Sequence, residues 1–377
     1  LESVEMIRQN PYVLCENKLV PFAIADRIAK DLDFSADEPK RVDTALLYVL
    51  NDYAGNKGHT FLIINRLPED CNAFLKESGE IKGSLSKRHI DAAVARCRSN
   101  GQIVTEGERV YSKKRYESEK TVADILRARI DVKSRYAAVP KEKIEACVAE
   151  IQEELEVELD PLQREAVEMA LCNQTSILTG GAGCGKTTTV RFIIGVMEKL
   201  SKICRISGVE IALAAPTGMA AKRMKASTGK EAKTIHKLIE YNPALPALTL
   251  NEDNPLPYDF VIVDELSMVD IDTMAMLLRA TRDTQLLLLG DVNQLPSIGP
   301  GEVLHDMINS EMFQVTALKR SFRHGARRTI LDNANRVLEG STELDFGHSD
   351  CVFYNVPDSS DDKNCNRLKK MLLNVYY

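Results

Sequence analysis

The feature that most constrains this chain is a glycine-rich pattern, Gly-x-x-x-x-Gly-Lys-Thr, that begins at Gly180 and ends at Thr187. It follows a short apolar run and opens a helix with apolar periodicity, which is the setting of a phosphate-binding loop. Glycine lets the backbone turn tightly, so that successive N–H groups point inward at phosphate oxygens. The helix that starts at Lys186 adds its positive end. We therefore expect a nucleoside triphosphate to bind at this point of the chain.

Two side chains of the loop have expected roles toward ATP. Lys186 should reach the β- and γ-phosphates, and the Thr187 hydroxyl should hold Mg²⁺. Cys184 also lies inside the loop, where we expect it to occupy a variable position without a redox role. The nine cysteines of the chain form no C-x-x-C pair and no cluster with histidine at zinc spacing. This usage is typical of a reduced cytoplasmic protein.

Length and composition limit the classes of protein that fit. A chain of 377 residues is long enough for two or three domains. Its 44% hydrophobic and 28% charged residues are typical of a globular protein. No apolar run approaches the roughly 20 residues needed to cross a bilayer, so no membrane partner is expected. The net charge of −6 argues against a basic nucleic-acid binder overall, but it leaves room for a local basic groove.

Hydrophobic periodicity divides the chain into regions. Residues 1–61 contain short segments with helical periodicity that alternate with polar breaks. Residues 62–150 combine helical runs with "QIVTEGERVYSKK", whose alternation predicts a β-hairpin and a winged-helix-like layout. Residues 151–345 alternate between strands and helices, and residues 346–377 begin a following region. The sequence pattern thus predicts a mainly helical N-terminal region followed by an α/β domain.

The α/β region has four expected strands, "TSILTG", "VEIALAAP", "YDFVIVDE" and "TQLLLLGD". Near-continuous apolar strands between helices indicate a parallel sheet that is covered on both faces. Such sheets bind ligands beyond the carboxyl ends of their strands. A polar motif follows each of these four strands, so we expect one site along that edge.

Two acids follow the third expected strand. Asp264 can hold the Mg²⁺ shared with Thr187, and Glu265 can orient and deprotonate an attacking water. After the fourth strand, the amide of Gln294 can sense the γ-phosphate. The simpler interpretations are an acidic helix cap and a tight surface turn.

Nucleic-acid contacts are expected from the remaining motifs. Pro216, Thr217 and Gly218 end the second strand, and the helix that follows them can donate hydrogen bonds to a phosphodiester backbone. "TIHKLI" adds Thr234 and His236, although a lone histidine is more often packed or solvated. Ahead of the phosphate loop, "DPLQREAV" contains a glutamine whose amide can read the adenine edge.

Taken in order, these motifs resemble superfamily 1 helicases of the RecD/TraA type, which include the alpha subunit of exodeoxyribonuclease V. The resemblance rests on "LDPLQREAV", "LTGGAGCGKTTT", "LAAPTGMAAKRM", "AKTIHKLI", "FVIVDELSMVD" and "LLLLGDVNQLPSIGPG". It implies a RecA-like P-loop domain and ATP-driven 5′→3′ movement along single-stranded DNA, with separation of the duplex ahead. DNA recombination or repair, and partnership with other subunits of a helicase–nuclease complex, are implied as well.

The resemblance also assigns roles to single residues. Gln163 would read adenine, Asp264 and Glu265 would be the magnesium and catalytic acids, and Gln294 would sense the γ-phosphate. Arg323 would stabilise transition-state charge, but the family writes glutamine where His324 follows here, so Arg320 is an alternative. The phosphate loop would comprise Gly180, Gly181, Ala182, Gly183, Cys184, Gly185, Lys186, Thr187 and Thr188.

The N-terminal region resembles the helix-hairpin-helix segment of the same family through "NPYVL", "ADRIA" and "GHTFL". Relatives carry glycines before "ADRIA", whereas this chain has Val20, Pro21 and Phe22. Proline removes a donor, so we expect packing rather than DNA contact from this hairpin. We expect the basic clusters Lys87–Arg88 and 113–115 to be solvated faces rather than phosphate contacts.

No motif of a second motor domain follows residue 340, and we expect a fragment that lacks that domain. The first hypothesis is an ATP-dependent DNA helicase. The alternative is a nucleotide-gated DNA-binding module that does not translocate. A third possibility is a P-loop ATPase that acts on RNA or as a recombination switch.

Overall fold

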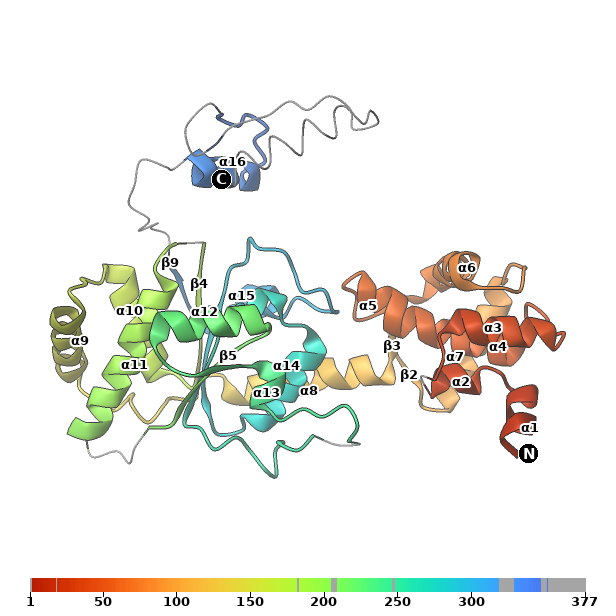
Figure 1. Ribbon diagram of the computed structural model, residues 1–377, viewed down its shortest axis with the longest axis horizontal. Helices are drawn as coiled ribbons and strands as arrows, with labels where there is room; N and C mark the ends of the chain where they lie inside the picture. The colour runs from red at the N-terminus through yellow and green to blue at the C-terminus, as the bar shows by residue number, and fades with distance from the viewer. Residues whose placement is uncertain are drawn as a thin grey trace. The chain divides into compact units, whose positions relative to one another are not determined.

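The computed structural model describes residues 2–17, 19–181, 183–204, 209–245, 248–318, 329–346 and 351. The chain forms two compact units, Leu1–Ser321 and Phe322–Tyr377 (Figure 1). In the second unit the described helix is α16 (Thr329–Leu338). The first unit contains the sheet and all the motifs described up to residue 318.

The N-terminal region is mainly helical, as expected, and is coloured red and orange in Figure 1. Its helices are α1 (Glu2–Gln9), α2 (Val13–Glu16), α3 (Phe22–Asp31), α4 (Pro39–Tyr48), α5 (Ala54–Asn56), α6 (Leu67–Ser78) and α7 (Lys87–Ser99). A π-helical turn, η1 (Val49–Tyr53), follows α4 directly.

The segment that replaces the family's glycine hairpin contributes to the core. Phe22 is 2% exposed, and its ring stacks on Tyr12 with centroids 5.7 Å apart. The same ring meets Tyr48 and Phe74 edge to face. Pro21 precedes α3 as its N-cap, where a missing N–H costs no helix hydrogen bond. These contacts agree with the packing role expected for this hairpin.

A small antiparallel sheet follows the helices. The expected hairpin forms from β2 (Ile103–Glu106) and β3 (Arg109–Ser112). A two-residue strand, β1 (Leu62–Ile63), pairs with the other edge of β3. The turn η2 (Ile64–Arg66) follows it. Periodicity did not predict β1, because two residues carry no alternation.

The helix α8 (Lys113–Arg129) leads from this small sheet to the α/β region and packs along α14 (Ile271–Ala280). The basic cluster at residues 113–115 was expected to be a solvated face, but only part of it is exposed to solvent. Arg115 forms an ion pair with Asp272, and its side chain is 13% exposed, whereas Lys114, bound to the same carboxylate, is 71% exposed. Charge alone could not reveal this, because the partner carboxylate lies far away in the sequence.

The α/β region is built on a six-stranded parallel sheet with the order β6-β5-β7-β8-β4-β9. The strands are β4 (Thr175–Gly180), β5 (Ile211–Ala215), β6 (Ala232–Thr234), β7 (Phe260–Val263), β8 (Gln285–Gly290) and β9 (Gln314–Leu318). The four expected strands are β4, β5, β7 and β8, which occupy the centre. The edge strands β6 and β9 were not predicted.

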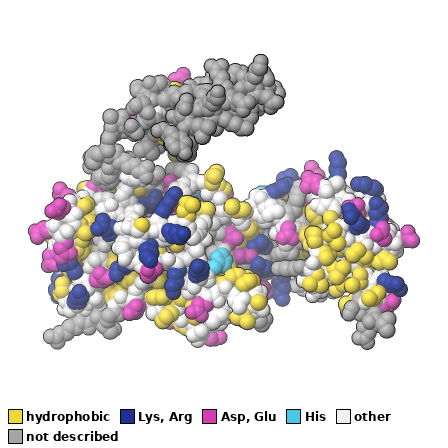
Figure 2. Space-filling model, viewed as in Figure 1, with side chains coloured by type: hydrophobic (Ala, Val, Ile, Leu, Met, Phe, Trp, Pro, Cys, Tyr) yellow, Lys and Arg dark blue, Asp and Glu magenta, His cyan; other side chains and the backbone are white. Residues whose placement is uncertain are grey.

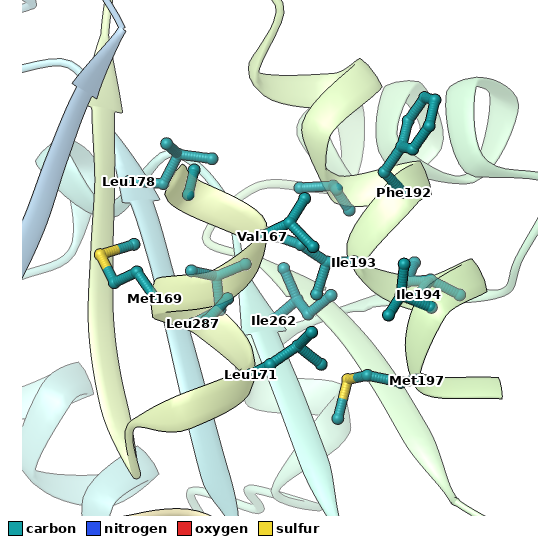
Figure 3. Close-up of a cluster of buried hydrophobic side chains, with 14 of the residues drawn as sticks. Val167, Met169, Leu171, Leu178, Phe192, Ile193, Ile194, Met197, Ile262 and Leu287 are labelled. Carbon is teal, nitrogen blue, oxygen red and sulfur yellow. The ribbon is translucent and has the colours of Figure 1, made fainter. Parts of the chain in front are cut away.

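Helices cover both faces of the sheet, as the apolar strands indicated. The other helices of the region are α9 (Lys141–Leu155), α10 (Pro161–Cys172), α11 (Lys186–Ile203), α12 (Gly218–Thr228), α13 (Ile235–Leu238), the short turn η3 (Leu266–Met268) and α15 (Val303–Asn309). Neighbouring residues of one strand face opposite cores: Ile262 joins α9, α10 and α11, whereas Val261 joins α8, α13, α14 and α15. Figure 3 shows the first core, with Leu287 and Ile262 beside side chains of α10 and α11.

Both cores take in side chains from before residue 151. Val122 and Leu126 of α8 belong to one, and Ile144 and Val148 of α9 belong to the other. The packed core of the α/β region therefore extends to elements that the sequence pattern placed in residues 62–150.

Candidate functional site

The polar motifs gather along one edge of the sheet. The strands β4, β5, β6, β7 and β8 run parallel, so their carboxyl ends share that edge. The phosphate loop follows β4, the acids follow β7, and the Asp291 loop follows β8. The segments expected to contact nucleic acid follow β5 and β6. This placement is the one that ligand-binding parallel sheets share.

The phosphate loop requires its glycines. The φ angles of Gly180, Gly183 and Gly185 are 153°, 79° and 93°, which residues with a Cβ rarely adopt. A Cβ on Gly180 would lie 2.7 Å from the carbonyl oxygen of Leu318 on β9. Lys186 Nζ donates hydrogen bonds to the carbonyl oxygens of Gly180 and Gly181. These bonds hold the ammonium group over the loop, where it can donate hydrogen bonds to phosphate oxygens instead of to the loop carbonyls.

Cys184 is buried at the phosphate loop. Its side chain is 4% exposed and belongs to the core formed by α10 and α11. A Cβ on Gly180 would lie 2.6 Å from Cys184 Sγ. Burial raises the pKa of the Cys184 thiol, although the nearby Lys186 charge opposes the rise. A neutral, enclosed thiol is a poor nucleophile.

The acidic pair lies at the end of β7. Asp264 N–H donates to the Ala214 carbonyl of β5 at 2.9 Å, which ties the turn to the sheet. Asp264 Oδ1 accepts the Glu265 N–H at 2.8 Å. Glu265 has a φ of 56°, a left-handed conformation that costs free energy in a residue with a side chain. Such strain is common at functional sites.

Electrostatics link this pair to the phosphate loop. Burial raises the pKa of Asp264, opposed by the Glu265 N–H and the Lys186 charge. Burial and the Asp264 charge raise the pKa of Glu265, while Lys186 and Arg223 lower it. Arg223 of α12 was quoted within a sequence motif but given no role. The effect of Arg223 on the pKa of Glu265 could not be predicted from the sequence, because it depends on how folding places α12.

The donor set at this edge fits Mg²⁺ bound through a nucleotide. Thr187 is exposed at the start of α11, and Asp264 has one carboxylate oxygen oriented by the Glu265 N–H. Within the described residues, no group of three or more His, Cys, Asp or Glu side chains could hold a metal ion alone. Mg²⁺ normally takes one or two protein ligands, and phosphates and waters supply the rest.

The loop after β8 presents Gln294 to solvent. Asp291 is 6% exposed, and its Oδ1 accepts the Asn293 N–H at 3.0 Å. The Gln294 N–H donates to the Asp291 carbonyl at 3.1 Å. Farther along, Ser297 Oγ lies 2.7 and 2.8 Å from the carbonyl oxygens of Gly299 and Gly301, which share its single O–H donor. Internal hydrogen bonds therefore shape this loop, and the Gln294 side chain is exposed.

Two helix N-termini follow β5 and β6. Thr217 is the N-cap of α12, and its Oγ1 accepts the Ala220 N–H at 3.2 Å. Pro216 is half-buried and Gly218 is exposed, with open space where a Cβ would lie. Figure 2 shows Lys and Arg side chains gathered over the part of the molecule where α12 lies. The local basic surface allowed by the sequence is present on this face.

Thr234 caps α13 in the same way, because its Oγ1 accepts the Lys237 N–H at 3.3 Å. His236 is half-buried, and its ring meets Tyr241 edge to face with centroids 5.3 Å apart. Part of its ring is therefore packed and part remains accessible.

Gln163 has a structural partner at the start of α10. Its Oε1 accepts the Asp160 N–H at 3.1 Å, and its own N–H donates to Asp160 Oδ1 at 2.9 Å. This reciprocal capping box buries the side chain to 3% exposure. Arg320, Arg323 and Ala182 lie outside the described residues.

Comparison with known proteins agrees with this arrangement. A family model described as an AAA domain matches residues 163–300, and one described as the ATP-dependent RecD2 DNA helicase HHH domain matches residues 1–61. The ATP-dependent RecD2 DNA helicase of Deinococcus radiodurans is 27% identical over 350 residues, covering 90% of this chain and 46% of that protein. The RecBCD enzyme subunit RecD of Mycolicibacterium smegmatis is 36% identical over 201 residues, covering 48% of this chain and 36% of that protein.

A solved Pif1 helicase from Candida albicans is 23% identical, with a TM-score of 0.35, and the match covers 48% of this chain and 44% of that one. The chain spans about half the length of the RecD2 protein it matches, or less in the case of RecD. No helix in the described part of the chain is long and apolar enough to cross a membrane. The N-terminal helical domain, the parallel sheet and the ordered motifs along its edge match this chain to the RecD/RecD2 family of DNA helicases.

Proposed function

We propose that this chain is the ATP-binding and DNA-binding part of a helicase that moves 5′→3′ along single-stranded DNA. One observation carries the proposal: the phosphate loop, the acid pair, Gln294 and two helix N-termini lie at the ends of parallel strands in a single sheet. A nucleotide site and a nucleic-acid site on neighbouring strand ends allow one to influence the other.

The proposed work on ATP is divided among few side chains. Lys186 leaves the loop carbonyls and neutralises β- and γ-phosphate charge. Glu265 accepts a proton from the attacking water, and Gln294 donates or accepts a hydrogen bond at the γ-phosphate. Thr187 and Asp264 would hold Mg²⁺, which supplies positive charge against the phosphates. Arg323 or Arg320 would add a further charge in the transition state.

The adenine contact proposed for Gln163 would be made by its Nε2 group, because Oε1 already accepts the Asp160 N–H in the capping box. The capping box also fixes the side chain, so a bound adenine would meet a pre-oriented donor.

The proposed DNA contacts lie on the β5 and β6 side. The Thr217 hydroxyl can donate to a phosphate while its oxygen caps α12, and Gly218 lets the strand approach the backbone closely. Pro216 holds the turn, and Thr234 and His236 continue the contact at the next strand end. In the whole protein we propose roles in recombination or repair in the cytoplasm, with single-stranded DNA, duplex ends and other helicase–nuclease subunits as partners.

A second candidate is a nucleotide-gated DNA-binding module without translocation. The observation that favours it is that the nucleotide motifs and the proposed DNA contacts lie along one edge of one sheet, which would suffice for nucleotide-gated binding.

Steady-state ATP hydrolysis with and without single-stranded DNA separates the two candidates. We expect DNA to stimulate hydrolysis if the chain acts as a motor, alone or by self-assembly. Lys186→Ala should abolish tight nucleotide binding, whereas Glu265→Gln should keep binding and lose turnover. Unchanged hydrolysis in Glu265→Gln would exclude Glu265 as the base. Nucleotide-dependent DNA binding without turnover would support the gated module.

A further inference from the structure

The first turn of α14 is connected to the acid pair by a short, hydrogen-bonded segment. The Met268 N–H donates to the Glu265 carbonyl at 3.0 Å, and the Val269 N–H donates to the Leu266 carbonyl at 3.0 Å. Asp270 follows as the N-cap of α14, with its Oδ1 accepting the Thr273 N–H at 2.7 Å. A hydrogen-bonded turn therefore joins Glu265 to the start of α14.

The loop that carries Gln294 docks on the same turn. Gly299 lies against the Asp270 side chain so closely that a Cβ there would be 2.2 Å from Asp270 Oδ2. The Ile271 N–H donates to the Pro300 carbonyl at 2.9 Å. The two segments expected to respond to the γ-phosphate thus converge on Asp270 and Ile271.

The opposite side of this turn is held by α8. Asp272 accepts hydrogen bonds from Lys114 Nζ at 2.7 Å and from Ser118 Oγ at 2.8 Å, and it pairs with Arg115. Its side chain is 13% exposed. These bonds outweigh the effect of burial and lower the pKa of Asp272, so the carboxylate stays ionised.

Next to the docked loop, the Gly301 N–H donates to the Gly58 carbonyl at 3.0 Å. Gly58 belongs to the helical N-terminal region. The helix α8 is also attached to that region, because it follows directly after the small sheet. The N-terminal region is therefore joined to the nucleotide-responsive segments at two places.

We propose that Asp272 is a positioning residue that couples the nucleotide site to α8 and the N-terminal region. The inference rests on the proposed ATP site. Asp270, Ile271 and Asp272 are consecutive: the first two contact the Gln294 loop and the third contacts α8. Because one rigid helical turn holds all three contacts, a shift on the nucleotide side changes the geometry on the α8 side. Such coupling is reciprocal, so α8 also influences nucleotide affinity.

The test compares hydrogen exchange of α8 with and without the ATP analogue AMP-PNP and Mg²⁺, in the same chain described here. The variants are Asp272→Asn, which keeps the side-chain volume, and the milder Ser118→Ala. The matched control is Glu117→Gln, because Glu117 pairs with Lys113 on α8 at 3.8 Å and is 57% exposed. Thermal unfolding establishes that each variant is folded, and AMP-PNP affinity is measured for each.

In the wild type and in Glu117→Gln we expect AMP-PNP to change exchange at the first turns of α8. In Asp272→Asn this change should disappear, and the Kd for AMP-PNP should differ by about five-fold or more, since coupling between sites is typically of that size. In Ser118→Ala the change in exchange caused by AMP-PNP should be intermediate between those of the wild type and Asp272→Asn. An equal exchange response in Asp272→Asn, or no response in a wild type that binds AMP-PNP, would show that Asp272 is only a structural brace. If the wild type binds AMP-PNP no better than Lys186→Ala, the ATP site itself is wrong, and this inference fails with it.

Discussion

At the scale of single residues, the environment of Glu265 determines the pH at which it can act as a base. Burial and the Asp264 charge raise the pKa of Glu265, and Lys186 and Arg223 hold it down. A base works only when ionised, and its ionised fraction falls as the pH falls through its pKa. Arg223 would therefore extend the pH range of Glu265, the proposed base, toward acid.

The first prediction follows from that balance. Arg223→Gln removes a positive charge near Glu265, so the pKa of Glu265 should rise. The acid limb of DNA-stimulated ATP hydrolysis should then move to higher pH, as measured by kcat against pH. Lys222→Gln on the same helix is the control and should leave the limb in place. An unmoved limb in Arg223→Gln would contradict this assignment.

A second residue-scale prediction concerns a buried ion pair in the N-terminal region. Asp26 and Arg41 are both fully buried, with Arg41 Nε donating to Asp26 Oδ1 at 2.7 Å. Asp26 also accepts hydrogen bonds from Tyr12 Oη at 2.7 Å and from the Glu80 N–H at 2.6 Å. Burial alone would raise the pKa of Asp26, but hydrogen bonds from Arg41, the Tyr12 hydroxyl and the Ile81 N–H lower it.

Asp26→Asn should cost about 3–5 kcal/mol in the free energy of unfolding, because it leaves Arg41 as an unpaired buried charge. A lowered native pKa contributes stability above the usual aspartate pKa, and this is lost as the pH falls through the native value. Urea unfolding at several pH values should therefore show less acid dependence in Asp26→Asn than in the wild type. Asp91→Asn, at an exposed pair with Lys87, is the control and should change little.

At the scale of secondary-structure elements, α12 joins a structural cap to the proposed DNA contact. Thr217→Ala removes the Oγ1 that accepts the Ala220 N–H, which should cost about 1 kcal/mol of stability. It also removes a proposed donor to phosphate, and a hydrogen bond to a charged group contributes roughly 1.5–3 kcal/mol, or about ten-fold or more in Kd. Fluorescence anisotropy with a single-stranded oligonucleotide measures the loss.

Thr217→Ser keeps both functions of the hydroxyl and should bind DNA as the wild type does. AMP-PNP affinity should stay unchanged in both variants, because Thr217 follows β5 rather than β4. Equal DNA affinity in the alanine and serine variants would argue against a phosphate contact by this hydroxyl.

Sequence patterns predicted elements well where burial on both sides left a continuous apolar run. The strands β4, β5, β7 and β8 lie at the centre of the sheet and were found for that reason. The edge strands β6 and β9 are partly exposed, with exposed residues at Lys233 and Gln314, so their pattern is mixed. The long helix α8 was missed because most of its surface is polar, and only a few residues such as Val122 and Leu126 are buried.

The position of the candidate motifs after β4, β5, β7 and β8 was predictable, because an apolar run precedes each of them. Contacts across the fold were not predictable: the influence of Arg223 on Glu265, and the bonds of Asp272 to α8, depend on helices brought together by folding. Gln163 shows a further limit, since the same spacing that suggests an adenine contact also forms a capping box.

At the scale of the whole molecule, Arg129 at the end of α8 holds several elements together. It is 5% exposed and donates to Thr175 Oγ1 at 2.8 Å and to the carbonyls of Thr281, Arg282, Gln174 and Thr284. These acceptors lie at or just before the start of β4 and in the segment between α14 and β8. Burial lowers the pKa of Arg129 to about 10, opposed by Asp283, so it remains charged at neutral pH.

Arg129→Met should lower the free energy of unfolding of the α/β region by at least about 2 kcal/mol, since each buried acceptor left unpaired costs roughly 1–3 kcal/mol. The measurement is chemical unfolding followed by circular dichroism. Arg127→Met removes an exposed arginine two residues earlier and should change stability little. Equal stability of the two variants would mean that water replaces the lost donors.

The strand order also has a consequence for synthesis on the ribosome. The strand β4 ends at Gly180 and pairs with β8 and β9, which begin at Gln285 and Gln314, whereas β5 pairs with β6 and β7. The strand β4, which carries the phosphate loop, is therefore synthesised before β5. It stays unpaired until β8 and β9 have been synthesised. At about 5–20 residues per second, this wait lasts several seconds or longer, with an apolar strand exposed. A nascent chain of this protein should therefore require protection from aggregation at β4 in particular, until β8 has left the exit tunnel.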